Sequence, residues 1–264
     1  VSLAVAAIPE ALPAVVTIAL ALGAQRMVHK EALVRKLPAV ETLGAVSVIC
    51  SDKTGTLTRN EMTVRSVLTT DGNFKVSGVG YRPQGGFEKD GTPIDRTASG
   101  TLMEAAKAAI LCNDAEVRES DGTWAVSGDP MEGALVSLGM KAGYDPERLR
   151  KQYPRTDEIP FDTQHQFMAT LHHGHEDGPN FAVIKGAPER VLSMCSRQLT
   201  TAGDAPLDAD RWTAQTEAFA VQGQRMLALA VKLFPEGHRQ LSFSDVSNGA
   251  TFIGLVGLID PPRE

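Results

Sequence analysis

An aspartate that follows a short apolar stretch is placed where phosphoryl transfer could occur. Residues 46–50 are apolar and mostly β-branched, which predicts a buried strand of an α/β sheet. Asp52 lies just beyond this stretch. Ligands of such sheets bind at the carboxyl ends of the strands, and a carboxylate there can attack a phosphoryl group to form an aspartyl-phosphate. The alternative interpretation is an ordinary turn after a strand.

The residues after Asp52 supply groups that this reaction needs. Lys53 adds a positive charge, Thr54 adds a hydroxyl group and Gly55 permits a tight turn. A transferring phosphoryl group carries negative charge, which Mg²⁺ and hydrogen-bond donors stabilise. The seven residues from Asp52 to Thr58 are therefore a far more specific signal than an isolated Asp-Lys pair.

A second candidate is Glu10, the only charged residue among the first 24. As a helix, these residues would be about 36 Å long, which is enough to cross a bilayer; a buried core helix is the alternative. Pro9 and Pro13 would free backbone carbonyls beside the Glu10 carboxylate, and oxygen ligands suit a cation. We therefore predict a transmembrane helix over 1–25 with a cation site at Glu10. A kinked helix whose glutamate pairs with a neighbouring helix is the other possibility.

The charge distribution separates the N-terminal segment from the rest of the chain. Residues 1–36 carry a net charge of +2, and the other residues of the 264 carry −8, for a total of −6. The positive charges follow the apolar segment, so the positive-inside tendency predicts an integral membrane protein whose residues after about 25 are cytoplasmic. The acidic average argues against a nucleic-acid partner, and three distant cysteines predict no disulfide framework.

Apolar periodicity predicts alternating strands and helices in the rest of the chain. We predict strands over 62–69, 158–161, 167–171, 181–185, 226–234 and 251–259, a hairpin over 116–126, and helices over 101–113, 130–142, 146–153, 187–196 and 208–222. Residues 71–100 are rich in Gly, Pro and Asp, which predicts turns and loop. This mixed pattern indicates an inserted α+β domain over 68–234.

The run Asp-Lys-Thr-Gly-Thr-Leu-Thr resembles the phosphorylation motif of the P-type cation-transporting ATPases. Residues 6–64 are similar to the calcium-pump-like branch of that family, in which Pro-Glu-x-Leu-Pro lies in the fourth membrane helix. The resemblance implies that Asp52 is phosphorylated, that Asp52 and the backbone of Thr54 hold Mg²⁺, and that Glu10 binds the transported cation.

The resemblance also implies a nucleotide-binding site in the inserted domain and at its exit. The implied residues are Glu132, Phe161, Lys185, Gly186, Arg225, Asp260 and Arg263. Phe161 would stack on adenine, although without the motif a core position would be preferred. Lys185 would pair with phosphate or the ring edge, with a solvated turn lysine as the alternative. The guanidinium of Arg225 can pair with phosphate through two donors.

Two positions in the implied nucleotide-binding domain depart from the family pattern. Met131 replaces the usual threonine, which removes a hydroxyl group. Gln166 stands where many relatives have a lysine, five residues after Phe161. The pocket would then lose a cation, which predicts weaker ATP affinity or a reshaped path for the phosphates.

The resemblance covers nearly the whole chain and implies an internal fragment, from the fourth membrane helix to the Asp-Pro-Pro-Arg motif. The implied fold is an incomplete, split haloacid-dehalogenase-like (Rossmann-like) α/β domain with an inserted nucleotide-binding domain and an N-terminal transmembrane helix. The expected domains are the membrane helix over 1–25, the stalk and first part of the phosphorylation domain over 26–67, the nucleotide-binding domain over 68–234 and the return to the phosphorylation domain over 235–264.

The implied function is an ATP-driven cation pump that works through an aspartyl-phosphate, with ATP and Mg²⁺ as cofactors. Ca²⁺ is the leading transported ion, and Na⁺, K⁺, H⁺ and Mn²⁺ stay open; membrane lipid and the remaining pump segments are the expected partners. We expect this chain to bind ATP without turning it over, because the family's later Mg²⁺-binding and dephosphorylation segments are missing. A membrane-anchored phosphatase is disfavoured because Thr54 stands where such enzymes carry an acidic residue, and a non-catalytic nucleotide-binding module stays open.

Overall fold

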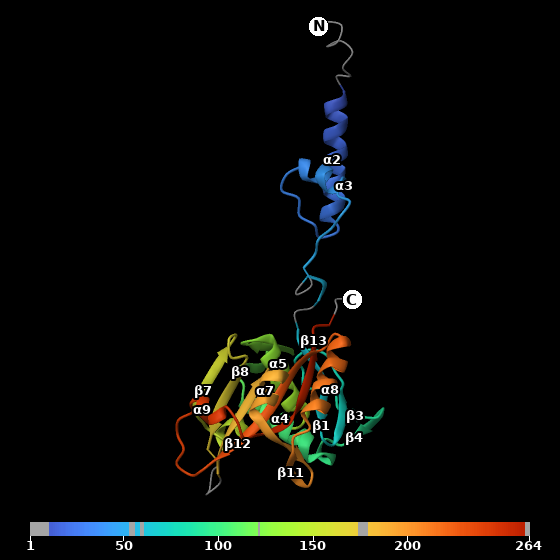
Figure 1. The fold of residues 1–264 in the computed structure, drawn as a ribbon. Coiled ribbons are helices and arrows are strands. Elements are labelled where there is room, and N and C mark those ends of the chain that lie inside the picture. Colours follow the sequence, from blue (N-terminus) through green and yellow to red (C-terminus); the bar gives the residue numbers. More distant parts are fainter. Residues whose placement is uncertain (1–10, 53–55, 59–60, 121, 174–178, 262–264) are drawn as a thin grey trace. The chain divides into compact units, whose positions relative to one another are not determined.

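The computed structural model describes residues 11–52, 56–58, 61–120, 122–173 and 179–261. The chain divides into two compact units, residues 1–52 and 53–264, and Figure 1 shows the elements of each. Each unit is described by itself below.

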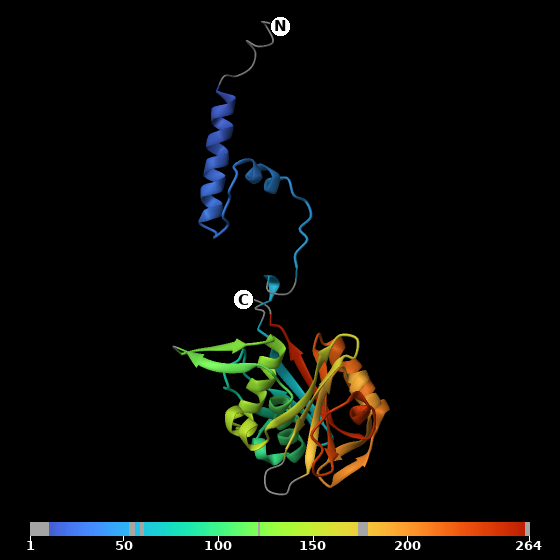
Figure 2. The ribbon, with the colours of Figure 1, turned by 90° about the vertical axis from the view of Figure 1, so that its left-hand side faces the viewer.

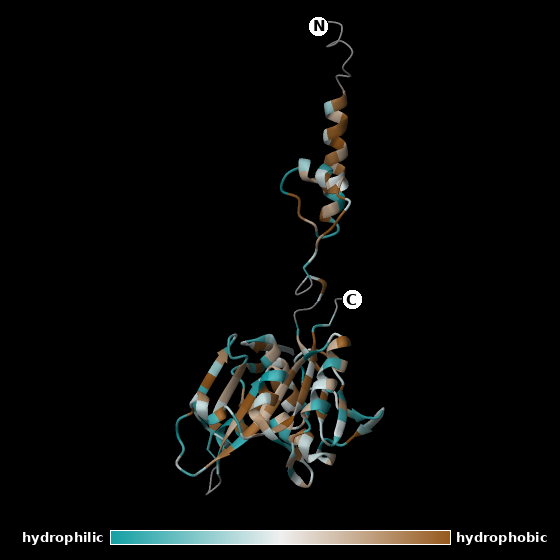
Figure 3. Cartoon of the chain, viewed as in Figure 1, coloured by the Kyte–Doolittle hydropathy of each residue, from teal (hydrophilic) through white to brown (hydrophobic). Residues whose placement is uncertain are grey.

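The first unit contains two helices. They are α2 (Leu12–Val28) and α3 (Pro38–Gly44), and each has a proline in its first turn, where the missing backbone N–H costs no hydrogen bond. Apolar residues predominate along α2 (Figure 3). Within the described ranges, no helix is long and apolar enough to cross a membrane. The predicted transmembrane helix over 1–25 is only partly described, and Glu10 lies outside the described residues.

The predicted strand over 46–50 is wrong. These residues form no regular structure, and Val48 and Ile49 are 74% and 86% exposed. A strand that is apolar on both faces is stable only between neighbours and under covering helices. None of the strands in the described part of the chain pairs with this segment, so those strands do not cover its apolar side chains.

The second unit is built on an 11-stranded sheet. Its main order is β4-β3-β2-β1-β13-β12-β9-β8-β7, with every neighbouring pair antiparallel. The strands of this order are β1 (Thr63–Thr69), β2 (Gly72–Val76), β3 (Phe87–Lys89), β4 (Thr92–Ile94), β7 (Arg155–Asp162), β8 (Phe167–His172), β9 (Asn180–Gly186), β12 (Arg225–Phe234) and β13 (Ala250–Ile259). Strand β10 (Cys195–Thr200) pairs in parallel with β13 and antiparallel with β11 (Gly203–Pro206).

Helices cover both faces of this sheet (Figure 2). The first face carries α4 (Gly100–Leu111), α5 (Pro130–Lys141) and α6 (Pro146–Gln152), and the second carries α7 (Pro188–Met194), α8 (Ala209–Val221) and α9 (Phe243–Val246). The alternation of strand side chains feeds the two cores: Leu229 packs on the first face, and Ala228 and Ala230 pack on the second. A short 3₁₀ helix, η2 (Arg96–Ala98), precedes α4.

A separate hairpin lies beside α5. It consists of β5 (Glu116–Ser120) and β6 (Thr123–Ser127), which pair antiparallel, and it confirms the hairpin predicted over 116–126. Gly133 of α5 allows the hairpin to approach, since a Cβ atom at this position would lie 2.3 Å from a methyl carbon of Val126. The predicted helices and strands after residue 100 are likewise confirmed, with shifted ends.

The prediction that residues 71–100 are only turns and loop is wrong. Strands β2, β3 and β4 form a meander at the edge of the sheet. Phe74, Val76 and Phe87 of this meander are buried. The strands are only three to five residues long, and the surrounding Gly, Pro and Asp residues hide so short an alternation.

Strand β13 lies at the centre of the sheet, between β1 and β12. It falls in the segment 235–264, which we expected to belong to the phosphorylation domain. The sheet therefore contains residues from both sides of the predicted boundaries at 67 and 234. The antiparallel pairing of β1 with β13 brings the two ends of the predicted insert together, and the assignment of the flanking segments to a phosphorylation domain stays a prediction.

His172 of β8 is a buried titratable group in this core, with 1% of its surface exposed. Its Nδ1 lies 2.9 Å from the carbonyl oxygen of Tyr153, and its Nε2 lies 2.8 Å from Oγ1 of Thr170. Burial lowers the pKa of His172 to about 4, and the nearby positive charge of Arg155 acts in the same direction. The folded chain therefore holds this imidazole neutral.

We expect His172 to make stability depend on pH between 4 and 6.5. The unfolded chain binds a proton near pH 6.5 and the folded chain only near pH 4, so falling pH favours unfolding across this window. The loss should reach about 3 kcal/mol at pH 4. Urea unfolding across this range should show a shallower pH dependence for His172→Gln than for the unchanged chain. His165→Gln, at a more exposed histidine, is the control, and equal slopes for both variants would contradict the assignment.

Candidate functional site

The predicted site residues of β7 and β9 lie at the same end of the sheet. Asp162 at the end of β7 pairs with Phe167 of β8, and Phe167 pairs with Gly186 at the end of β9. Phe161 directly precedes Asp162, and Lys185 directly precedes Gly186. Phe161 therefore lies at the sheet end that carries Lys185 and Gly186, two strands away.

The predicted residues of β12 and β13 lie at this end too. Gly186 pairs with Ala228 of β12, and Arg225 begins β12 three residues before Ala228. Arg225 in turn pairs with Leu258 of β13, and Asp260 follows the end of that strand. With strands about 4.8 Å apart, the row from β7 to β12 is about 14 Å long and the row from β7 to β13 about 19 Å. An extended ligand could contact several of these residues, whereas a single small ion could not.

A buried ion pair joins the sheet to α5. The Nζ atom of Lys185 lies 2.5 Å from Oε1 of Glu132, and the side chains are 8% and 18% exposed. The second oxygen of Glu132 accepts a hydrogen bond from the backbone N–H of Asp114, at 3.2 Å. Glu132 Oε1 is the only hydrogen-bond partner of Lys185 Nζ within the described ranges. Because an ammonium group has three donors, Lys185 can also donate to a bound phosphate or ring nitrogen.

The start of α5 fixes the position of Glu132. Asp129 caps the helix, and its Oδ1 accepts hydrogen bonds from the backbone N–H groups of Met131 and Glu132, at 2.8 and 3.2 Å. Pro130 occupies the first turn, where it suits the helix. A carboxylate in the first turn also interacts favourably with the helix dipole. The sequence Asp-Pro-x-Glu therefore places the Glu132 side chain beside the end of β9.

Asn113 holds the end of α4 against the start of α5, and the sequence analysis missed it. Its Nδ2 donates to the carbonyl oxygens of Ala109 and Glu132, at 3.0 and 2.9 Å, and its Oδ1 accepts from the N–H of Ala115 at 2.8 Å. The side chain is 1% exposed. A polar residue at the end of an apolar helix was a usable signal for a cap, but its bond to Glu132 depends on the tertiary fold.

The end of β9 leaves no room for a side chain at Gly186. A Cβ atom there would lie 2.5 Å from the carbonyl oxygen of Gln166 and 2.7 Å from Cβ of Phe167. That carbonyl oxygen accepts the N–H of Ala187, at 2.9 Å. Gln166 itself adopts a left-handed backbone conformation, with φ of 59°. The β7–β8 turn therefore packs directly on the start of the segment that leads into α7.

Phe161 is not a core residue. Its side chain is 60% exposed, which removes the alternative interpretation that Phe161 is part of the hydrophobic core. Its place near the end of β7 coincides with an irregularity in the β7–β8 register between Ile159 and Asp162. Arg225 is also exposed. Both side chains are therefore accessible to a ligand at this end of the sheet.

Asp260 links the segment before β1 to the segment after β13. Oγ1 of Thr58 donates to Oδ2 of Asp260, at 2.5 Å, whereas Oδ1 is buried and has no hydrogen-bond partner among the residues that the structure describes. Tyr81 lies close by. Burial first, and then the charges of Glu61, Asp129 and Asp260, raise the pKa of Tyr81. The surroundings of Asp260 are thus acidic.

The predicted phosphorylation residues are described only in part. Asp52 is exposed and belongs to the first compact unit. Lys53, Thr54 and Arg263 lie outside the described residues. In the part of the chain that is described, no group of three or more His, Cys, Asp or Glu side chains could hold a metal ion. The exposed carboxylate of Asp52 is nevertheless a hard oxygen ligand of the type that Mg²⁺ prefers.

The chain is similar to known proteins over its whole length. A family model described as "P-type ATPase, cytoplasmic domain N" matches residues 101–264. The chain is 45% identical to the cation-transporting ATPase pma1 of Synechocystis sp., 41% identical to a calcium-transporting ATPase of Bacillus subtilis and 43% identical to the calcium-transporting ATPase type 2C member 1 of Bos taurus. These alignments cover 100% of the chain and 29%, 30% and 26% of the respective relatives, so the chain spans less than a third of each.

Proposed function

Because the chain belongs to the P-type ATPase family, we propose that it is part of an ATP-driven cation pump. The family model covers the second unit from residue 101 onward, and the end of its sheet carries the proposed nucleotide site. One observation supports this site most strongly: the buried Lys185–Glu132 pair stands at the sheet end that also carries the exposed Phe161.

The proposed nucleotide lies across this end of the sheet. Its adenine ring stacks on Phe161 and meets Glu132, and its phosphates meet Lys185 and Arg225. Stacking suits an exposed aromatic ring, and the arginine can pair with a phosphate through two donors. Gly186 permits close approach of the backbone to the nucleotide, and Asp260 and Arg263 also contribute to the proposed site.

The proposed phosphoryl acceptor is Asp52. Lys53 and Thr54 assist it, and Asp52 with the backbone of Thr54 would hold Mg²⁺. When bound, this ion neutralises charge that develops on the transferring phosphoryl group. The flanking segments belong to a haloacid-dehalogenase-like phosphorylation domain in this proposal. In the same proposal, residues 1–25 form a transmembrane helix in contact with lipid, and the later residues are cytoplasmic. Further segments complete the pump.

Ca²⁺ is the proposed transported ion. Two relatives that share more than 40% identity with the chain are named calcium-transporting ATPases, and the proposed ligand in this chain is Glu10. Carboxylate and carbonyl oxygens between two prolines are ligands of the kind that Ca²⁺ prefers. Na⁺, K⁺, H⁺ and Mn²⁺ are the competing ions.

We expect Phe161→Ala to weaken MgATP binding about tenfold, because stacking of an aromatic side chain on a base contributes about 1–3 kcal/mol. Isothermal titration calorimetry of the 264-residue chain measures this effect. Phe243→Ala is the matched control, since Phe243 is also half-exposed but packs against His165 and Phe167. An equal loss in both variants, or no loss for Phe161→Ala, would be inconsistent with stacking at Phe161.

We expect Gln166→Lys to tighten MgATP binding about fivefold, since a new cation beside the phosphates contributes about 1 kcal/mol. Gln166 is exposed and follows the turn after Phe161. Gln164→Lys adds the same charge to the same turn and is the control, with little change expected. The idea that Gln166 limits affinity fails if calorimetry gives equal dissociation constants for Gln166→Lys and the unchanged chain.

A further inference from the structure

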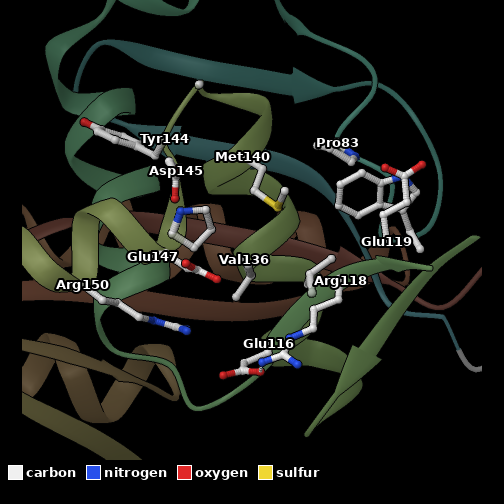
Figure 4. Close-up of a pocket in the computed structure, with 14 residues that line it drawn as sticks. Pro83, Glu116, Arg118, Glu119, Val136, Met140, Tyr144, Asp145, Glu147 and Arg150 are labelled. Carbon is white, nitrogen blue, oxygen red and sulfur yellow. Dashed lines mark ion pairs between the residues drawn. The ribbon is translucent and has the colours of Figure 1, made fainter. Parts of the chain in front are cut away.

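A cavity lies between the β5–β6 hairpin and the helices α5 and α6, as Figure 4 shows. Its volume is about 720 Å³. None of the described residues that line it belongs to the proposed nucleotide site. It is large enough for several side chains of a polypeptide, and far larger than a single ion requires.

The outer edge of β5 borders this cavity. Successive side chains of a strand point to opposite faces, yet all four consecutive residues from Glu116 to Glu119 line the cavity. A run of four is possible when the cavity lies along the strand's edge rather than over one face. Among the described residues, this sheet has two strands only. Unpaired backbone groups on such an edge are a template for a further strand.

The floor of the cavity is apolar. Val136 and Met140 of α5 contribute to it (Figure 4), and Trp124 of β6 lines it with a half-buried indole ring. Trp124 stands opposite Glu119 in the hairpin register, so an aromatic ring and a carboxylate lie side by side. Aromatic rings with polar neighbours are typical anchor points of protein interfaces.

The rim of the cavity is acidic. Four carboxylate residues and two arginines line it, so negative charges outnumber positive ones. Arg118 pairs with Glu116, at 2.6 Å, and Arg150 donates to a backbone carbonyl oxygen of the chain, at 2.9 Å. Glu119 and Glu147 have no ion-pair partner in the described part of the chain. The unbalanced charge therefore favours a cationic occupant.

We propose that this cavity binds an extended basic segment of a partner protein, which adds to β5 as a third strand. Backbone hydrogen bonds to the β5 edge align the segment, as in other cases of strand addition. Lysine or arginine side chains of the segment pair with Glu119 and Glu147 at the rim. Apolar side chains between them cover Trp124 and Met140. The surface serves docking and shares none of its described lining residues with the proposed nucleotide site.

The test uses a labelled synthetic peptide of alternating lysine and valine, titrated against the 264-residue chain by fluorescence anisotropy. Saturable binding is expected, and the matched glutamate–valine peptide should not bind. Glu119→Lys combined with Glu147→Lys should weaken binding of the basic peptide at least about tenfold. Asp210→Lys combined with Glu217→Lys makes the same charge change on α8 and should leave binding unchanged.

A second peptide tests the strand addition itself. N-methylation at alternate residues removes backbone donors without changing charge, and it should abolish binding if the methylated edge faces β5. Two such peptides are needed, one methylated at the odd positions and one at the even positions, because either edge of the peptide could face β5. One of the two should fail to bind. The proposal is overturned if neither peptide binds less well, if the acidic peptide binds equally, or if no peptide binds. It is also overturned if spermine displaces the peptide completely while methylation has no effect. A dimer of this chain that Glu119→Lys with Glu147→Lys breaks would overturn it as well.

Discussion

Replacing Lys185 with methionine should lower the free energy of unfolding by about 3 kcal/mol. The Glu132 side chain, which is 18% exposed, would keep its carboxylate. It would lose the ion-pair partner that lies 2.5 Å away in the unchanged chain. Removing one partner of such a pair is costly because the remaining charge stays desolvated without compensation. The bond from the N–H of Asp114 to Glu132 offsets only part of this cost.

Urea unfolding of three variants separates this effect from general damage. Lys185→Met combined with Glu132→Leu removes both charges, so stability should return to within about 1 kcal/mol of the unchanged chain. Lys75→Met, at an exposed lysine of β2, should change stability by less than about 0.5 kcal/mol. A loss for Lys185→Met no larger than that of Lys75→Met would show that the pair does not contribute as described.

The same variants distinguish stability from nucleotide binding. The single and the double variant both lack the Lys185 ammonium group, so both should lose MgATP affinity although only the single variant is unstable. A double variant that is stable and still binds MgATP normally would remove Lys185 from the site.

Long apolar runs and helix-start signals made much of the second unit predictable. The strands expected over 226–234 and 251–259 are nearly the observed β12 and β13, because each run is long and apolar enough to identify a central strand. The helix expected from Pro130 begins there, since Asp129 and Pro130 are a recognisable cap and first turn. The position of Glu132 on the site side of α5 follows from this start.

Other features depend on partners distant in the sequence, which local patterns do not reveal. The segment 46–50 has the composition of a buried strand but is exposed, because composition cannot supply the neighbouring strands. Phe74 and Phe87 are buried in short strands that Gly-rich turns conceal. The hydrogen bond from Asn113 to Glu132 joins two helices, so neither helix alone predicts it. The ion pair of Lys185 with Glu132 likewise appears only once β9 lies beside α5.

The largest expected effect is at Asp52 in the full-length protein that contains this chain. If Asp52 is the phosphoryl acceptor, Asp52→Asn removes the attacking carboxylate oxygen, and an amide at the same place cannot form the acyl-phosphate. The loss should therefore be complete rather than partial. Asp90→Asn is the matched control, since Asp90 is exposed in the β3–β4 turn with φ of 51°, a conformation that asparagine adopts readily.

The most direct measurement is incorporation of the γ-phosphoryl group of labelled ATP into the full-length protein, followed by acid quenching. We expect an acid-stable phosphoprotein whose formation Ca²⁺ stimulates, in the unchanged protein and in Asp90→Asn. We expect none in Asp52→Asn. Stimulation by another cation alone would contradict the choice of Ca²⁺, and phosphoprotein that survives in Asp52→Asn would contradict the proposal that this chain carries the phosphorylation site of a cation pump.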